Sequence, residues 1–361
     1  MPKTPDGRSA AEAGGREVFS VFELATVLSH YDLGVIQSIK SFPRGSRKAP
    51  KLVLNTDKGR VLLKRRAHGK NDAHKVAFGH QLQLFLAAQH FPLPTLIGTT
   101  KDNNSLLQWE GAIYEVFEFI SGNNYDSSLE ATADAGRVLG LFHKLLRDYE
   151  PHFKPAKGSY HASRAVDTAV ETMPHTLAAT TPSAAGQADD IVDLVAWMAQ
   201  QYKRAAAAVN DAGLPDWPVQ IVHGDWHPGN MLFRGPRVVA VIDYDAARMQ
   251  QRVLDIANGA LQFSILGGRD DPDRWPDHLD ISRYKRFVLG YEADPACVLS
   301  RAELRAIPPL MIEALISECV IPIAATGSFA QLNGLSFLRM VQRKVRWLVE
   351  QAEALVDIVE A

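Results

Sequence analysis

The sequence has little cysteine, no large excess of charge of one sign and no long apolar run. Its 361 residues include two cysteines, Cys297 and Cys319, too few for a disulfide framework or a four-ligand zinc site, which suits a reducing compartment. The formal net charge is −2, so the chain lacks the overall field that binds nucleic acid or an acidic membrane. No stretch approaches the roughly 18 or more apolar residues that a membrane span requires. We therefore expect a cytoplasmic protein with no nucleic-acid or membrane partner.

The pattern of strand and helix signals predicts an α+β chain in two parts. Residues 1–20 are polar and glycine-rich and are expected to form a flexible tail. Residues 21–121 are expected to form a small antiparallel sheet with one helix, and residues 122–361 a mainly helical part. The strands of the first part are expected at 33–39, 51–55, 60–64, 105–109 and 112–119, and its helix at 72–89. The second part is expected to have helices at 128–146 and within 185–209, strands at 219–222, 231–233 and 238–242, and helices from 255 onward.

One segment, residues 220–245, carries most of the chemistry: QIVHGDWHPGNMLFRGPRVVAVIDYD. Its polar loop lies between apolar strands, so acids and an amide are placed at strand ends. Phosphoryl transfer uses an Asp that accepts the hydroxyl proton, an Asn five residues later that holds metal, and an Asp after an apolar strand that binds the metal bridging the phosphates. Asp225, Asn230 and Asp243 fill these positions in order. Their hard oxygen ligands suit Mg²⁺, with ATP as the phosphoryl donor.

The motifs HGDWHPGN and VIDYD, followed by LDIA at 254–257, resemble the HGDxHxxN and IDxD signatures of the aminoglycoside phosphotransferase and choline kinase superfamily, including its spore-coat-type and homoserine-kinase-like members. This resemblance implies a bilobal protein-kinase-like fold and transfer of phosphate to an alcohol group of a small molecule. It also implies that Asp225 is the catalytic base and that Asn230 and Asp243 hold the metal. By the same resemblance, His223 is a scaffold for the loop and Asp255 is its buried brace.

Individual residues of the loop have ordinary alternatives. An Asp at the end of a strand often caps the next helix. Asp245 has three open roles: metal ligand, substrate contact or helix cap. His227 lies next to a proline, and we expect it to orient the loop by a hydrogen bond.

The first part should supply a lysine that holds ATP. Lys64 ends the strand RVLLK and points to the opposite face from Leu63 if that leucine is in the core; Arg65 and Arg66 compete for the role. The family's usual partner of this lysine is a Glu on the following helix, but residues 78–86 contain no acid. We expect Lys64 to be paired by a phosphate alone, or by weaker contacts from His80, Gln81 or Gln83.

The loop expected to cover the phosphates, residues 41–51, has one glycine, Gly45, where a glycine-rich run is usual. Its basic residues could grip phosphate, or the loop could be a solvated turn. The connection YEVFEFISG at 114–122 resembles the family's hinge, in which backbone groups around Glu118 and Ile120 would bind the adenine and Phe117 would pack behind it.

Two competing classes stay open at this point. A pseudokinase or structural scaffold would account for the absent helix Glu and the poor glycine loop. A zinc hydrolase would use His223, Asp225 and His227, but no third nitrogen or sulfur ligand is close in sequence. The acceptor is expected in the helical part, where a cationic alcohol or amine-bearing sugar could contact acids, with residues 267–277 as a possible mobile lid. These acids are Asp270, Asp271, Asp273, Asp277, Glu313 and Glu318.

Overall fold

The computed structural model describes residues 16–180, 188–268 and 271–360. The chain divides into two compact units: the first ends at Ser121 and also includes Pro151–Lys154, and the second comprises Gly122–Glu150 and the chain from Pro155 onward. The predicted tail lies outside the described residues up to residue 15. Its last residues are attached to the first unit, because Arg16 donates to the carbonyls of Pro43 and Ser46 and Ser20 caps a helix.

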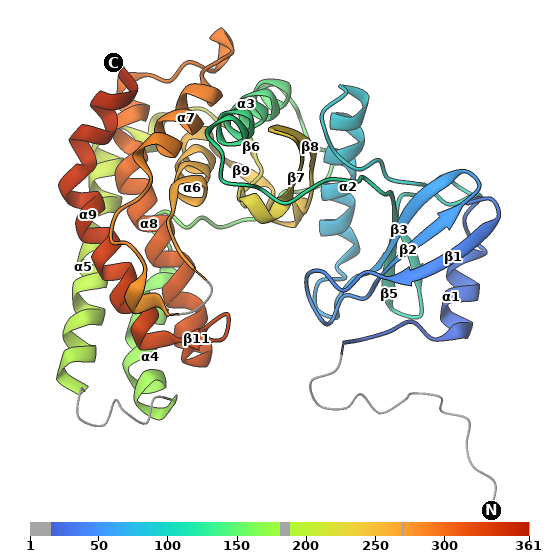
Figure 1. The fold of residues 1–361 in the computed structure, drawn as a ribbon, viewed down its shortest axis with the longest axis horizontal. Coiled ribbons are helices and arrows are strands. Elements are labelled where there is room, and N and C mark those ends of the chain that lie inside the picture. Colours follow the sequence, from blue (N-terminus) through green and yellow to red (C-terminus); the bar gives the residue numbers. More distant parts are fainter. Residues whose placement is uncertain (1–15, 181–187, 269–270, 361) are drawn as a thin grey trace, which may run out of the picture. The chain divides into compact units, whose positions relative to one another are not determined.

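The first unit is built on one antiparallel sheet with the strand order β1-β2-β3-β5-β4 (Figure 1). The strands are β1 (Ile36–Ser41), β2 (Lys51–Thr56), β3 (Gly59–Arg65), β4 (Leu107–Trp109) and β5 (Ala112–Glu118). Helix α1 (Val21–Leu28), which is outside our sequence expectations, begins with a capping box formed by Ser20 and Glu23. Val27 of α1 packs with Leu63 and Val116 in one buried cluster, which defines one face of the sheet.

Helix α2 (Ala73–Ala88) follows β3 as predicted, with Asp72 as its N-cap. Its His80 contacts Glu115 of β5, and Glu115 lies opposite Lys64 of β3 in the strand register. Successive strand residues point to opposite faces, so Lys64 and Glu115 share the α2 face while Leu63 lies on the α1 face. The predicted orientation of Lys64 relative to Leu63 is therefore what the structure has.

The second unit is mainly helical, which confirms the predicted α+β class. Its helices are α3 (Leu129–Leu146), α4 (Arg164–Thr180), α5 (Ala188–Asp211), α6 (Arg252–Ser264), α7 (Ile281–Tyr291), α8 (Arg301–Thr326) and α9 (Gly334–Glu360). Two short ribbons lie among them: β6 (Val219–Val222) with β9 (Arg248–Gln251), and β7 (Met231–Arg234) with β8 (Arg237–Val241). A third, β10 (Ser328–Phe329) with β11 (Leu332–Asn333), joins α8 to α9. Helix α4 and strand β9 are absent from our sequence expectations.

The expectation that no stretch is apolar enough to span a membrane is wrong for helix α8. It meets the length and composition of a span, and 78% of its most apolar window is buried inside the protein. It packs against α4, α5, α6 and α9 and contains Pro308, Pro309 and Pro322. One such helix is weak evidence for a membrane span, because the central helix of a folded domain has the same composition.

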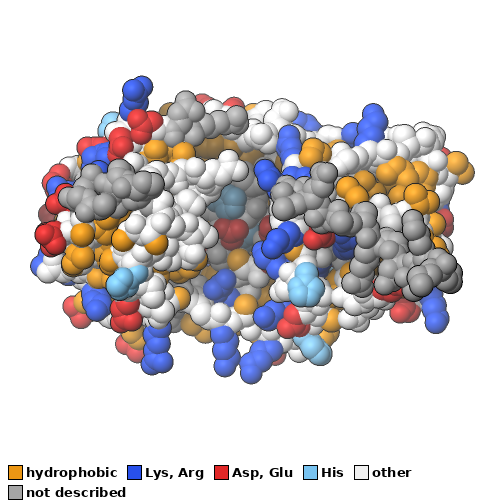
Figure 2. All heavy atoms as spheres, turned by 90° about the horizontal axis from the view of Figure 1, so that it is seen from below, with side chains coloured by type: hydrophobic (Ala, Val, Ile, Leu, Met, Phe, Trp, Pro, Cys, Tyr) orange, Lys and Arg blue, Asp and Glu red, His pale blue; other side chains and the backbone are white. Residues whose placement is uncertain are grey.

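Side chains of both charge signs are interspersed over the face drawn in Figure 2. This distribution matches the small net charge of the whole chain.

Candidate active site

The loop after β6 and the hairpin β7–β8 bring the predicted acids and amide together. Met231 pairs with Val241 in the hairpin, and the amide of Ile242 donates to the carbonyl of Asn230 at 2.9 Å. Asn230 and Asp243 are therefore at the same end of the hairpin. The side-chain amide of Asn230 donates to Oδ2 of Asp225 at 2.8 Å and to its carbonyl at 3.0 Å. All three residues thus belong to one local arrangement.

Asp225 is a partly exposed, ionised carboxylate held by polar neighbours. Its side chain is 43% exposed, so a substrate hydroxyl can reach it, and Nε2 of His227 lies 3.4 Å from its Oδ2. Burial raises the pKa of Asp225, but the hydrogen bonds from His227 and Asn230 outweigh burial and lower the pKa. The reciprocal contact from Asp225 raises the pKa of His227 against the effect of burial. Asp225 is therefore ionised and able to accept a proton at neutral pH.

His227 also fixes the shape of the loop. Its Nδ1 accepts from the amide of Gly229 at 3.0 Å, which is the N-cap bond of the short 3₁₀ turn Pro228–Asn230. Nε2 is then the protonated nitrogen that faces Asp225. One side chain thereby orients both the start and the end of the catalytic loop.

Asp243 presents an exposed carboxylate that does not cap the next turn. Its backbone has φ of 67°, in the left-handed region, and its side chain makes no capping bond to the 3₁₀ turn Tyr244–Ala246. A left-handed backbone is uncommon, although Asp tolerates it better than most residues do. Asp245 is exposed within that turn, and the N-cap of α6 is Gln251. The cap role that we considered for Asp245 is therefore wrong.

Asp255 of α6 holds the start of the loop through two backbone bonds. Its carboxylate accepts from the amides of His223 at 2.6 Å and Gly224 at 2.8 Å, and Nε2 of His143 lies 3.3 Å from it. Asp255 is 2% exposed. Gly224 has φ of 75°, and a Cβ there would lie 2.5 Å from the carbonyl oxygen of Ala246. This close approach of two backbones requires glycine.

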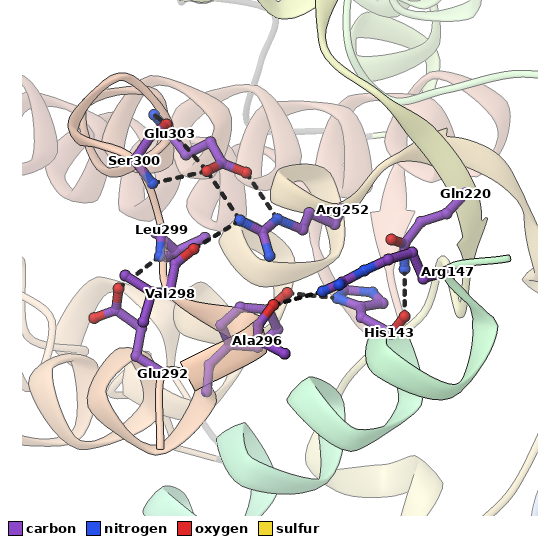
Figure 3. A network of polar contacts seen from close by, with 11 residues as sticks. His143, Arg147, Gln220, Arg252, Glu292, Ala296, Val298, Leu299, Ser300 and Glu303 are labelled. Atoms are coloured by element: carbon purple, nitrogen blue, oxygen red, sulfur yellow. Dashed lines mark hydrogen bonds and ion pairs between the residues drawn. The ribbon is translucent and has the colours of Figure 1, made fainter. Parts of the chain in front are cut away.

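A polar network fixes the first turn of α6, the helix that carries Asp255 (Figure 3). Arg252 donates to both carboxylate oxygens of Glu303 at 2.8 and 3.0 Å and to the carbonyl of Val298 at 2.9 Å. On the α3 side, Gln220 of β6 donates to the carbonyl of His143 at 3.1 Å. Bidentate Arg–carboxylate pairs are directional, so this network holds the α6 turn that presents Asp255 to the loop.

His223 is buried in an aromatic cage. Its ring lies near those of Phe142, Trp226 and Tyr244, with centroid distances of 6.0, 5.3 and 5.2 Å, and neither ring nitrogen has a partner among the described residues. Burial lowers the pKa of His223, so the ring is neutral. No group of three His, Cys, Asp or Glu that could hold a metal occurs in the described part of the chain. These residues do not support the zinc hydrolase alternative.

Beside Asp225, the second unit has a cavity of about 290 Å³. Its polar lining comes from the loop before α4, the catalytic loop, β9, α6 and α8. These polar residues are Ser159, Tyr160, Ser163, Asp225, Arg248, Gln250, Asp255, Asn258, Ser317 and Glu318. The cavity therefore combines carboxylates, including that of Asp225, with hydroxyls and one guanidinium.

Of the six acids that we considered as acceptor contacts, most of which we expected to be solvated at the surface, Glu318 lines this cavity. Glu313 is buried and accepts from His161 at 2.8 Å and the amide of Ala162 at 2.9 Å, so it positions the loop that lines the cavity. Asp277 pairs with Arg343 of α9 at 2.6 Å, and the carbonyls of Pro272 and Pro276 accept from Arg343 and Lys344. These contacts tie residues 271–278 to α9, against their role as a mobile lid. Asp270 lies outside the described residues.

In the first unit, Lys64 has a carboxylate partner that our sequence expectation missed. Its Nζ lies 3.3 Å from Oε2 of Glu115, the residue directly opposite on β5. The expectation of pairing by phosphate alone, or by His80, Gln81 or Gln83, is wrong. An acid in the middle of the apolar strand AIYEVFE was the available signal, because a buried charge needs a partner. Arg65 faces α1 and binds Glu23 at 2.6 Å.

The remaining predicted nucleotide contacts also lie in the first unit. Gly45 has φ of 77° in the β1–β2 loop, whose carbonyls accept from Arg16 and Lys51. In the hinge, the amide of Glu118 donates to the carbonyl of Thr95 at 2.8 Å, so this amide is already engaged. No backbone hydrogen bond joins Ile120 to another described residue. Phe117 is half-buried on the Lys64 face.

Comparisons with known proteins concern the family and the fold of the chain. A model of the phosphotransferase enzyme family matches residues 38–299. An aminoglycoside phosphotransferase from Alicyclobacillus acidocaldarius has a similar structure, with a TM-score of 0.64, 18% identity, and 97% of this chain and 98% of that chain covered. A microcompartment-associated aminopropanol kinase gives a TM-score of 0.67 at 13% identity, covering 93% and 99%.

A choline kinase from Cryptosporidium parvum gives a TM-score of 0.59 at 13% identity, covering 89% of this chain and 90% of that one. At these identities the likeness shows the fold, which is that of protein-kinase-like small-molecule kinases and confirms the prediction. Among curated protein sequences, none matches the chain.

Proposed function

Because the chain belongs to the phosphotransferase enzyme family, we propose that it transfers the γ-phosphoryl group of ATP, with Mg²⁺, to a hydroxyl group of a small molecule. The observation that carries the proposal is the arrangement of three residues in the second unit. Asn230 donates its side-chain amide to Asp225, and the β7–β8 hairpin puts Asp243 at the same end.

The donor set fits magnesium. The amide nitrogen of Asn230 is used on Asp225, so its side-chain oxygen remains for a metal, and Asp243 adds an exposed carboxylate. Mg²⁺ in nucleotide sites is held by one or two protein oxygens together with phosphate oxygens and water. ATP would supply the electrophilic γ-phosphorus. Mg²⁺, when bound, would neutralise negative charge on the phosphates.

Asp225 performs the proton transfer in this scheme. Its carboxylate accepts the proton of the acceptor hydroxyl as that oxygen bonds to the γ-phosphorus, the bond to the bridging oxygen breaks, and ADP leaves. His227 and Asn230 orient the carboxylate through their contacts with Oδ2. Asp255 holds the backbone that leads into Asp225. We assign Lys64 to the phosphates of ATP and the hinge backbone at Ile120 to the adenine.

We propose the cavity beside Asp225 as the acceptor site. Its carboxylate Glu318 and its hydroxyls suit a small alcohol that carries an amine, as the names of the aminopropanol and choline kinases indicate for those proteins. A cytoplasmic location suits such an ATP-dependent reaction.

The alternative is a pseudokinase that binds nucleotide without turnover. Two features of the sequence supported this alternative: residues 78–86 contain no glutamate, and the loop at 41–51 has one glycine where several are usual. Glu115 supplies a carboxylate to Lys64 from another element, so the first of these arguments is weakened. The intact Asp225, Asn230 and Asp243 favour the enzyme.

A screen of amino alcohols, hydroxy metabolites and aminoglycosides tests the proposal. ADP release is measured with Mg·ATP, with and without each acceptor, and the phosphorylated product is identified by mass spectrometry. We expect at least one amine-bearing alcohol to stimulate Mg-dependent ADP release. Nucleotide binding without stimulation by any acceptor would favour the pseudokinase.

A further inference from the structure

A cluster of four polar residues is buried on the α2 face of the sheet: Lys64, Arg66, His80 and Glu115. Glu115 is its centre and is 1% exposed. Its Oε1 accepts from Arg66 at 2.8 Å and contacts Nε2 of His80 at 2.7 Å, while Nζ of Lys64 lies 3.3 Å from Oε2. The cluster thus joins β3, β5 and α2 through one carboxylate.

The contacts of His80 define what α2 contributes. Nε2 of His80 faces Glu115, and Nδ1 lies 2.9 Å from the hydroxyl of Ser105. A neutral ring with its proton on Nε2 satisfies both contacts, donating to Glu115 and accepting from Ser105. The helix therefore adds a hydrogen-bond donor to the cluster, and the negative charge comes from β5.

The charges of the cluster do not cancel. One carboxylate faces two cations, Lys64 and Arg66, which leaves an excess of one positive charge. Burial raises the pKa of Glu115, but the charge of Lys64, the hydrogen bond from His80 and the charge of Arg66 lower it well below its ordinary value. Oε2 has no hydrogen-bond partner within the described residues. Glu115 therefore acts on Lys64 through its charge rather than through a hydrogen bond.

We propose that Glu115 is the positioning residue for Lys64, taking from β5 the role that a helix glutamate has in kinases with a lysine–glutamate pair. It holds the lysine on the α2 face, with the excess positive charge left for a phosphate of the nucleotide. Because Lys64 and Glu115 are direct neighbours in the β3–β5 register, the pair is part of the sheet itself. Both members of the pair lie on the sheet, whereas α2 contributes the contact of His80 with Glu115.

The opposite face of the same sheet provides a matched control. Glu23 of α1 is also buried, binds Arg65 of β3 at 2.6 Å and accepts from the hydroxyl of Tyr114 at 2.9 Å. Its removal disturbs a similar ion pair on a neighbouring residue of β3 without touching Lys64. Glu23→Gln therefore measures the general effect of losing a buried carboxylate in this unit.

The inference rests on the proposed function, and a double-mutant cycle of Mg·ATP affinity tests it. Lys64→Met and Glu115→Gln should each raise the Kd by roughly tenfold or more, since a hydrogen bond to a charged group is worth about that factor. The double variant should bind no more weakly than Lys64→Met alone, because Glu115 acts through the lysine. Glu23→Gln should keep the wild-type Kd while its thermal midpoint falls.

The outcomes separate this inference from the proposed function. A Glu115→Gln variant with wild-type affinity, or effects of the two changes that simply add, overturns the positioning role while Lys64 keeps its place. A Lys64→Met variant with unchanged affinity, or a wild-type protein that binds no Mg·ATP, overturns the proposed function and this inference together. Should Glu115→Gln fail to fold, Glu115→Asp keeps the charge, and its Kd should lie between those of wild type and Lys64→Met; a Kd equal to that of Lys64→Met contradicts the role.

Discussion

Replacing Asp255 by Asn should destabilise the second unit and abolish transfer, although Asp255 is not proposed to touch substrate. The two oxygens of its carboxylate accept separate backbone amides, those of His223 and Gly224, at 2.6 and 2.8 Å. An amide side chain has one oxygen and one NH₂ group. In either orientation of the Asn side chain, its NH₂ group therefore faces one of the two backbone N–H groups, and this buried N–H loses its acceptor.

The expected loss follows from these bonds. A hydrogen bond to a charged group contributes about 1.5–3 kcal/mol, and a buried donor left without a partner costs about 1–3 kcal/mol. Asn keeps one acceptor, so we expect the free energy of unfolding to fall by about 2–4 kcal/mol. The backbone before Asp225 also loses its fixed path, so kcat should fall more than the affinity for ATP, which we assign largely to other residues.

Urea unfolding of the second unit measures the change, followed by tryptophan fluorescence because Trp226 is buried in the same loop. Asp167→Asn is the matched control: Asp167 is an exposed acid of α4, 4.0 Å from Lys203, and its unfolding curve should stay close to wild type. If Asp255→Asn unfolds like the control and keeps wild-type kcat, the brace has no role and our reasoning is refuted.

Three further predictions concern other groups. In His227→Ala, the hydrogen bond that lowers the pKa of Asp225 is lost, so this pKa rises and the acid limb of the pH–rate profile should move to higher pH; an unmoved limb contradicts the contact. Burial lowers the pKa of Lys344 from 10.5 to about 8. Between pH 8 and pH 10.5 the folded state therefore binds fewer protons than the unfolded state. In this range the free energy of unfolding should rise with pH. Lys344→Met should lack that rise when urea unfolding is compared at both ends of this window. Glu313→Gln loosens the loop held through His161 and Ala162, so it should raise the acceptor KM with little change in the KM for ATP.

The sequence predicts that three polar residues of the second unit come together, because they are close along the chain. Asp225, Asn230 and Asp243 lie within one loop and one hairpin, so strand and turn signals suffice to bring them together. Asp255 came only from the family resemblance, because its contact with the loop depends on how α6 packs.

The Lys64 site shows the limit of this reasoning. Glu115 reaches Lys64 through a strand pairing across about fifty residues of chain, with α2 and β4 between the two strands, and local periodicity carries no information on such pairing. Helix α4 was missed because its Pro174 and polar composition read as a connection. Its stability comes from packing against α8 and α5.

The most direct test of the central claim compares wild type and Asp225→Asn in the same two assays. One assay measures Mg·ATP affinity, and the other measures formation of the phosphorylated acceptor found in the screen. The account predicts that Asp225→Asn binds Mg·ATP within a few-fold of wild type and forms no product above background. Product formation at the wild-type rate by Asp225→Asn would contradict the assignment of Asp225 as the base.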